Sequence, residues 1–218
     1  MSCKSMAMPP GEPKSPEQVQ QWIEKHARDH DRFAHVAAKY DGHRATHGCY
    51  DVYPYPNGAL LGTLAATHRA RRILEVGCGL GYSALWFAYG GGPGTVVESI
   101  ERDPQHAAIA REHFKAEGLG ERIKVFAGLG AKVLPTLKDT YDLGYFDTDP
   151  AESLIDLEQF ERLLKPAGLL ISANLFLAQY APDLPGLEKT AEYRERILDS
   201  TRWLTSYLPD GTALSVKR

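Results

Sequence analysis

Three glycines, Gly77, Gly79 and Gly81, alternate with other residues directly after the apolar segment 72–76. Glycine lets the backbone turn tightly and lets a ligand approach the main chain closely. Residues 83–89 are predicted to be helical, and the first turn of a helix presents free N–H groups. A strand that ends in such a turn and continues into a helix indicates a ligand site at the end of the strand.

This turn differs from two common phosphate-binding motifs. A dinucleotide fingerprint needs its third glycine one residue later, where Tyr82 stands. A phosphate loop needs a Gly-Lys-Ser/Thr sequence, and none follows the turn. Glu75, two residues before Gly77, also disfavours a phosphate. A cationic or zwitterionic ligand suits this turn better.

A second acidic residue, Glu101, lies 20 residues after Gly81, at the predicted end of the next strand. An acidic side chain at the carboxyl edge of a sheet can accept both hydroxyls of a ribose. Together the two markers indicate a nucleoside with an intact ribose diol and no phosphate recognition, which describes S-adenosylmethionine (SAM). The alternative is a purely structural glycine turn beside a solvated Glu101, and the spacing disfavours it.

The elements that must hold this turn alternate between strands and helices. Predicted strands cover residues 72–76, 95–100, 123–127, 141–146 and 169–172, and predicted helices cover residues 83–89, 104–116, 131–137 and 151–164. This alternation predicts a Rossmann-like, doubly wound α/β fold whose mainly parallel sheet has helices on both faces. Two further strands around residues 209–211 predict a C-terminal antiparallel hairpin and a total of seven strands.

The N-terminal part is expected to add a tail, a helix and a loop. Residues 1–16 contain four prolines and are predicted to be a flexible tail, and residues 17–218 to be a single domain. Ser15 is the predicted N-cap of an extra helix that runs to about Tyr40. Residues 41–57 are predicted to be a lid loop, so that 17–57 precede a cofactor-binding core of residues 58–218.

Composition excludes several classes of protein. The chain has 218 residues, 43% hydrophobic and 24% charged, as expected of one large globular domain. Its net charge of −3 provides no global basic field for nucleic acid. It contains no apolar run long enough to span a membrane. Three widely spaced cysteines indicate reduced thiols and a cytoplasmic protein.

Over about residues 54–218 the chain resembles the class I SAM-dependent methyltransferases, and more narrowly the catechol and caffeoyl-CoA O-methyltransferases. The matching segments are residues 74–83, 101–104, 122–128, 131–137, 141–149, 163–171 and 208–211. The resemblance implies that Gly77, Tyr82 and Ser83 line the methionine side and that Glu101 holds the ribose. With the neighbouring positions, the predicted cofactor-binding residues are Glu75, Gly77, Gly79, Gly81, Tyr82, Ser83, Glu101, Arg102, Gly128, Leu129, Gly130 and Asp147.

The chain departs from this family at the metal site. The family holds a divalent metal with an Asp-Asn pair and the first Asp of an Asp-x-Asp-Lys segment. Here Asp147 and Asn174 are kept, but Ala173 replaces the other aspartate and Pro150 replaces the lysine. One carboxylate is a poor ligand set for Mg²⁺. We therefore predict no functional divalent metal at this place, unless Asp149 substitutes as a ligand.

Without that metal, positioning and a base can suffice, because the methyl group of a sulfonium is already activated. The candidate bases are His43, His47 and Asp149. The two histidines lie in the predicted lid loop, in which Tyr50, Tyr53 and Tyr55 could form an aromatic wall. The alternative is a solvent-exposed loop with ordinary histidines.

These observations predict a SAM-dependent O-methyltransferase that acts on a small phenolic or catechol-like molecule. The first alternative is a catalytically silent protein that binds SAM or S-adenosylhomocysteine (SAH), because Ala173 and Pro150 replace expected catalytic residues. The second is a nicotinamide-dependent oxidoreductase, against which Tyr82 counts. The expected partner is a small-molecule substrate. No interaction with a membrane is expected, and binding of nucleic acid is disfavoured. The resemblance suggests a homodimer.

Overall fold

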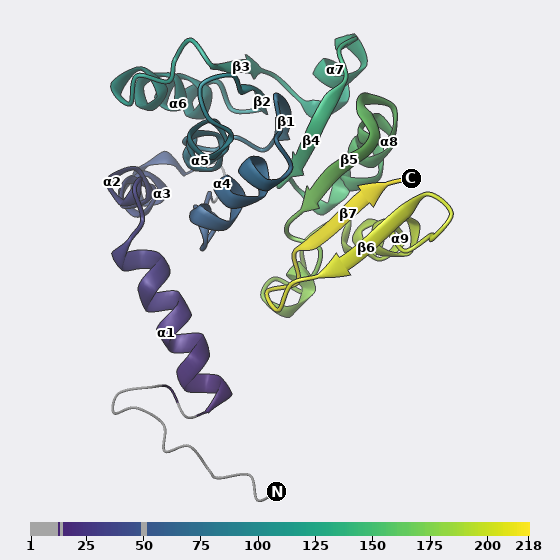
Figure 1. Cartoon of the computed structure of the whole chain (residues 1–218), viewed down its shortest axis with the longest axis horizontal. Coiled ribbons are helices and arrows are strands. Elements are labelled where there is room, and N and C mark those ends of the chain that lie inside the picture. Colours follow the sequence, from purple (N-terminus) through teal and green to yellow (C-terminus); the bar gives the residue numbers. More distant parts are fainter. Residues whose placement is uncertain (1–12, 14, 49–51) are drawn as a thin grey trace, which may run out of the picture.

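A computed structural model describes residues 13, 15–48 and 52–218 of the chain, and a twisted sheet forms its centre (Figure 1). Its strands are β1 (Arg72–Val76), β2 (Val96–Glu101), β3 (Ile123–Ala127), β4 (Tyr141–Phe146), β5 (Leu164–Ser172), β6 (Trp203–Tyr207) and β7 (Ala213–Lys217). Among the described residues the seven strands have the order β3-β2-β1-β4-β5-β7-β6. Strands β1 to β5 pair in parallel and β7 is antiparallel to β5 and β6. The predicted sheet and its C-terminal hairpin are confirmed.

Helices cover both faces of this sheet. They are α1 (Pro16–Asp29), α2 (Ala34–Ala37), α3 (Lys39–His47), α4 (Gly58–Thr67), α5 (Tyr82–Gly91), α6 (Pro104–Ala116), α7 (Gly130–Val133), α8 (Ser153–Leu163) and α9 (Leu187–Ile197). Side chains of α4, α5 and α6 pack on one face, and those of α8 and α9 pack on the other. Short 3-10 turns cover Leu134–Thr136, Pro150–Glu152 and Leu177–Gln179. The central strands β1 and β4 are therefore largely buried on both sides.

The prediction of one long N-terminal helix to Tyr40 is wrong. Its start is confirmed, since the Ser15 side chain caps α1 by accepting from the Gln18 N–H. The helix ends at Asp29 because Asp31 turns the chain: its carboxylate accepts from the Phe33 N–H at 2.8 Å. Phe33 is then fully buried against the Trp86 ring. A straight helix could not deliver Phe33 to the core while α1 projects away from it, as Figure 1 shows.

The prediction of a loop over residues 41–57 is also wrong in its first half, where α3 extends to His47. Its glycines, histidines and tyrosines suggested a loop, but burial of one face decides the local structure. Tyr40 is 2% exposed on this helix. Gly48 ends the helix in the left-handed conformation that glycine adopts readily. Of the predicted aromatic wall, Tyr50 lies outside the described residues, as does most of the predicted tail of residues 1–16.

Among the described residues, none of the helices combines the length and apolarity needed to cross a bilayer.

Candidate active site

The carboxyl ends of four neighbouring strands bring the predicted site residues together. The Gly77 N–H donates to the Ile100 carbonyl at 3.0 Å, and the Asp147 N–H donates to the Val76 carbonyl at 2.9 Å. The Ala173 N–H donates to the Phe146 carbonyl at 2.8 Å. Each chain segment therefore leaves its strand still tied to the next one. This edge carries the glycine turn, Glu101, Asp147 and Asn174.

The glycine turn lies directly against the end of β4. Gly77 has φ +97°, and a Cβ there would lie 1.9 Å from the Asp147 carbonyl oxygen. A Cβ on Gly81 would lie 2.5 Å from the Phe114 ring. The Gly79 N–H donates to the Glu101 carboxylate at 2.6 Å. Glycine is thus required both for the backbone angle and for close packing within the protein.

Sequence reasoning missed Tyr40, which covers this turn. Its hydroxyl accepts hydrogen bonds from the Leu80 N–H at 3.1 Å and the Tyr82 N–H at 3.3 Å. The N–H groups that open α5 are therefore partly satisfied by an N-terminal side chain. No local signal marks Tyr40, because it lies about 40 residues from the turn in sequence.

The predicted methionine-side residues Tyr82 and Ser83 make contacts inside the protein. The Tyr82 hydroxyl donates to the Asp31 carboxylate at 2.8 Å, so this ring secures the chain between α1 and α2. The Ser83 hydroxyl donates to the Glu75 carboxylate at 2.5 Å. What these two residues offer a ligand in this structure is chiefly the main chain at the start of α5.

Glu75 is fully buried in the sheet, between Ser99 on β2 and Tyr145 on β4 in the strand register. Its carboxylate accepts from the hydroxyls of Ser83 and Ser99. Burial raises the pKa of Glu75 to about 7; these two hydrogen bonds oppose the shift, and the charges of Asp147 and Glu101 reinforce it. Glu75 therefore lies behind the glycine turn as a support that is close to neutral.

Asp147 follows β4 and is held on both carboxylate oxygens. The Tyr145 hydroxyl donates to Oδ2 at 2.9 Å, and the Asn174 amide donates to Oδ1. Burial raises the pKa of Asp147 to about 6; the bond from Tyr145 opposes the shift, and the charge of Glu101 adds to it. Asn174 adopts φ +58°, which asparagine tolerates better than most residues.

These three carboxylates, Glu75, Glu101 and Asp147, form an acidic cluster, and a cation brought to them would relieve their repulsion. The positively charged sulfonium of SAM meets this requirement, whereas a phosphate does not. Glu101 keeps lone pairs for a diol beside its bonds from the N–H groups of Gly79 and Asp103. The donor set on this edge therefore fits SAM.

The predicted adenine side lies between the end of β3 and α8. Gly128 has φ +155°, and Leu129 is 43% exposed. Gly130 is buried, and a Cβ there would lie 2.8 Å from Asp156 Oδ1. This oxygen has no hydrogen-bond partner among the described residues, and burial raises the pKa of Asp156 to about 7. Asp156 thus places a polar atom beside Gly130.

The same edge does not fit the family's divalent metal. Asn174 presents its amide N–H to Asp147 rather than an oxygen to a shared ion. Asp149, the predicted substitute ligand, forms an ion pair with Arg102 at 2.5 Å. Ala173 carries no ligand atom. Hard cations need several oxygen ligands, and Asp147 is the one carboxylate that these positions aim at the site.

His43 and His47, the other predicted bases, lie together on α3 and face His106 in the first turn of α6. The three ring centroids are 4.5 to 4.8 Å apart. Burial and the neighbouring His106 and His47 lower the pKa of His43, with Asp103 opposing the shift. We call these residues the histidine cluster. It adjoins Glu101 and Asp103 at the end of β2.

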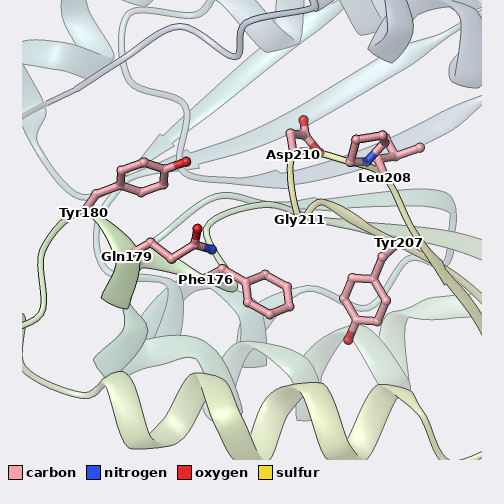
Figure 2. Close-up of a pocket in the computed structure, with 8 residues that line it drawn as sticks. Phe176, Gln179, Tyr180, Tyr207, Leu208, Asp210 and Gly211 are labelled. Atoms are coloured by element: carbon pink, nitrogen blue, oxygen red, sulfur yellow. The ribbon is translucent and has the colours of Figure 1, made fainter. Parts of the chain in front are cut away.

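A pocket opens between the chain after β5 and the β6–β7 hairpin (Figure 2). Its volume is about 280 Å³, and aromatic rings line it together with polar groups. The lining residues are Phe176, Gln179, Tyr180, Tyr207, Leu208, Pro209, Asp210 and Gly211. Figure 2 shows the Phe176 and Tyr207 rings approaching from opposite walls.

Tyr55 joins this pocket to Asp147. Its hydroxyl donates to Asp210 at 2.8 Å, and its ring contacts the Tyr145 ring edge-on with centroids 6.4 Å apart. Tyr145 in turn donates to Asp147. Among the described members of the predicted aromatic wall, Tyr55 is therefore the one that reaches the site. Tyr53, by contrast, is 64% exposed, with the guanidinium of Arg44 over its ring.

Comparison with known proteins identifies the family of the chain. A family described as O-methyltransferase matches residues 47–183. A relative in Mycolicibacterium vanbaalenii, whose name places it among the O-methyltransferases, is 36% identical over 163 residues, 72% of either chain. The catechol O-methyltransferase of Mycobacterium tuberculosis is 33% identical over 119 residues, 54% of either chain. The chain thus spans little more than half the length of some curated relatives it matches.

Solved structures show the same fold. The O-methyltransferase from Bacillus cereus in complex with SAH aligns with a TM-score of 0.74 and 23% identity, over 92% of this chain and 100% of that one. The family match and the relative of 36% identity establish that the chain belongs to the SAM-dependent O-methyltransferase family. The nicotinamide-dependent alternative is therefore set aside.

Proposed function

We propose that this protein uses SAM to methylate a hydroxyl of a small phenolic or catechol-like molecule, without a divalent metal at Asp147 and Asn174. The observation that carries this proposal is the state of Asp147. It lies beside the glycine turn, two hydrogen bonds hold it, and burial raises its pKa to about 6. A carboxylate with a raised pKa is a suitable acceptor for a substrate proton near neutral pH.

SAM, when bound, supplies a methyl group already activated on a cationic sulfur. Glu101 is proposed to hold the ribose, and Arg102, Gly128, Leu129 and Gly130 to border the nucleoside. The turn Gly77 to Gly81 is proposed to bring main-chain groups to the methionine portion, with Tyr40 fixing its position through the Leu80 and Tyr82 N–H groups. Pre-organised positioning of this kind lowers the barrier of a bimolecular reaction.

Asp147 is proposed to take the acceptor proton as the oxygen–carbon bond forms and the carbon–sulfur bond breaks. The proton moves to a carboxylate oxygen, and the bonding pair of the broken bond stays on sulfur, so the products are the methyl ether and SAH. Tyr145 and Asn174 keep the carboxylate oriented during this transfer. Its raised pKa also means that the protonated product state is less costly than for an exposed aspartate.

The pocket of Figure 2 is proposed to bind the acceptor. Phe176 and Tyr207, whose ring centroids are 5.8 Å apart, supply an aromatic wall for a planar substrate. Asp210 and Gln179 add polar atoms that could bind a second hydroxyl. Its volume of about 280 Å³ suits a molecule with one ring better than a nucleic acid.

His43, His47 and Asp149 remain candidate bases, and one set of variants separates them from Asp147. The chelator-treated protein is incubated with SAM and a panel of phenols and catechols, and SAH is quantified by mass spectrometry. We expect turnover in the presence of EDTA and a loss of kcat of roughly 10²–10⁴-fold in Asp147→Asn. Asp149→Asn, His43→Ala and His47→Ala should change kcat by no more than a few fold.

Two other outcomes would contradict the proposal. If SAH binds but no acceptor is methylated faster than with Glu101→Ala, the catalytically silent alternative is correct. If turnover requires Mg²⁺, and Asp147→Ala abolishes the heat of Mg²⁺ binding, a metal site is rebuilt at this edge and the metal-free proposal fails.

We also propose that the protein is a homodimer that pairs through α1. This helix has no buried residues, and its large apolar side chains Val19, Trp22 and Ile23 are 43–55% exposed. Sedimentation should give twice the chain mass for the natural protein and for Gln21→Glu, and a single chain for Ile23→Glu. A single chain throughout would refute this pairing. The cytoplasmic location, inferred from the cysteines, stays a prediction.

A further inference from the structure

The histidine cluster outside the methylation site has the composition of a transition-metal site. His43 and His47 are four residues apart on α3 and therefore share one face of that helix. His106 approaches from α6, and one ligand atom from each ring lies within 4.8 Å of the others. His106 is 1% exposed, and the His47 side chain is 4% exposed. Three imidazoles in partly dehydrated surroundings are an uncommon way to fill space.

The ring nitrogens divide into two sets. His43 Nε2, His47 Nδ1 and His106 Nε2 are buried and have no hydrogen-bond partner among the described residues. The opposite nitrogens of two rings face carboxylates: His47 Nε2 lies 3.3 Å from Asp103 Oδ2, and His106 Nδ1 lies 3.7 Å from Glu101 Oε1. A carboxylate that accepts a hydrogen bond from the N–H of one ring nitrogen leaves the lone pair on the other nitrogen. This is the outer-shell arrangement that orients metal-binding histidines.

We propose that His43, His47 and His106 bind a zinc ion, with Asp103 and Glu101 orienting the rings and a water molecule completing the tetrahedron. Imidazole nitrogens suit zinc and its transition-metal neighbours, whereas Mg²⁺ and Ca²⁺ prefer oxygen. Zinc–nitrogen bonds of about 2.0–2.1 Å place tetrahedral ligands about 3.3 Å apart. One nitrogen from each ring lies within 4.8 Å of the others, so ring movements of about 1 Å reach that geometry.

The position of the site assigns the ion a structural role. Zinc would join α3 to α6, and Tyr40 lies on α3 three residues before His43 and seven before His47, on the same face. The hydroxyl of Tyr40 holds the N–H groups of Leu80 and Tyr82 in the glycine turn. Zinc would therefore fix the N-terminal segment over the cofactor turn. This role is separate from the proposed methyl transfer at Asp147.

The test uses the full chain, stripped of metal by a strong chelator and titrated with Zn²⁺ against a competing chelator. We expect one zinc per chain and a loss of affinity of at least roughly 100-fold in His47→Ala. Because His106 is fully buried, the more exposed His43 provides a second variant, His43→Ala, that spares the core. Asp103→Asn keeps the Oδ1 cap on α6 and should weaken binding by roughly 10–100-fold.

The matched control is the other histidine pair of the same spacing, His26 in the exposed helix α1 and His30 at its C-cap, whose ring centroids are 4.2 Å apart. Their double alanine variant should keep full zinc affinity. Bound Co²⁺ should give the intense visible absorption of a tetrahedral ion. Zinc should also slow hydrogen exchange of the Leu80 and Tyr82 amides in the natural protein but not in His47→Ala.

Each other result overturns the proposal. Absence of stoichiometric zinc binding in the natural protein means that the three rings only pack against one another. Binding that survives in both His43→Ala and His47→Ala, or that disappears with His26 and His30, places the ion elsewhere. Binding without added protection of the two amides removes the structural role.

Discussion

The charge state of Asp147 makes SAM binding depend on pH in a way that SAH binding should not. The two ligands share the nucleoside and the amino-acid portion, and they differ by the methyl group and the sulfonium charge. With a pKa of about 6, Asp147 is about 90% ionised at pH 7 and about 10% ionised at pH 5. If the cation is bound by the ionised form, SAM affinity falls roughly tenfold over this interval.

Glu75, with a pKa of about 7, adds to this effect, because its ionised fraction also decreases between pH 7 and pH 5. The assay is calorimetric titration of SAM and SAH at half-unit steps from pH 5 to pH 8. The measured quantity is the ratio of the two dissociation constants, which cancels pH effects on the shared portions. We expect SAM to gain on SAH as pH rises. In Asp147→Asn the ratio should depend less on pH, because one of the two ionising groups has been removed.

A matched control separates Asp147 from the rest of the edge. Asp149 is also an aspartate near the end of β4, but it forms an ion pair with Arg102 and is 45% exposed. Asp149→Asn should leave the pH profile unchanged. A ratio that is flat with pH in the natural protein, or a profile that Asp149→Asn alters as much as Asp147→Asn does, would refute the assignment of cation recognition to Asp147.

Three further predictions concern the framework of the site. Gly77→Ala should either not fold or lose more than about 3 kcal/mol of unfolding free energy, because its Cβ would lie 1.9 Å from a carbonyl oxygen. Gly42 has open space around it in α3, so Gly42→Ala should raise the unfolding free energy by about 0.5–1 kcal/mol. Urea unfolding measures both effects. Because the pKa of Glu75 is raised to about 7, its neutral form stabilises the ligand-free fold. This stabilisation is complete below about pH 4.5 and is lost as the pH rises through about 7. Glu75→Gln should therefore melt at a higher temperature than the natural protein at pH 8, but not at pH 5. Tyr40→Phe leaves the Leu80 and Tyr82 N–H groups without their acceptor, so it should speed the hydrogen exchange of both amides and lower the free energy of unfolding by about 1–2 kcal/mol. Unchanged exchange of these amides would contradict the role of Tyr40.

The core of this fold could be predicted because its signals are local. The glycine turn, the alternating strands and helices, and the hairpin around residues 209–211 each lie within a short window of sequence, and the sheet order confirms them. The gathering of Glu101 and Asp147 at one edge follows from parallel strands alone. Helix α9 was not predicted, since its buried side chains, such as Tyr193, are separated by long charged residues.

The N-terminal segment could not be predicted because its structure depends on distant partners. Residues 30–33 lack a helix breaker such as proline. The chain nevertheless turns there, because Asp31 accepts a hydrogen bond from the Tyr82 hydroxyl and Phe33 is buried in the core. His43 and His47 look like loop residues until His106, about 60 residues later, is brought against them. The local sequence around these residues does not predict their contacts with residues that are distant in the chain.

The replacement of the family aspartate by Ala173 has a physical explanation in this site. The edge already holds Glu75, Glu101 and Asp147, and their mutual repulsion contributes to the raised pKa values of Glu75 and Asp147. A fourth carboxylate at position 173, next to Asn174, would add to that repulsion unless a divalent cation neutralised it. Alanine at position 173 is therefore consistent with the proposed absence of a divalent metal. Restoring the ligand with Ala173→Asp should lower the stability of the chelator-treated protein, and added Mg²⁺ should restore it only if Asn174 can turn its oxygen toward the ion.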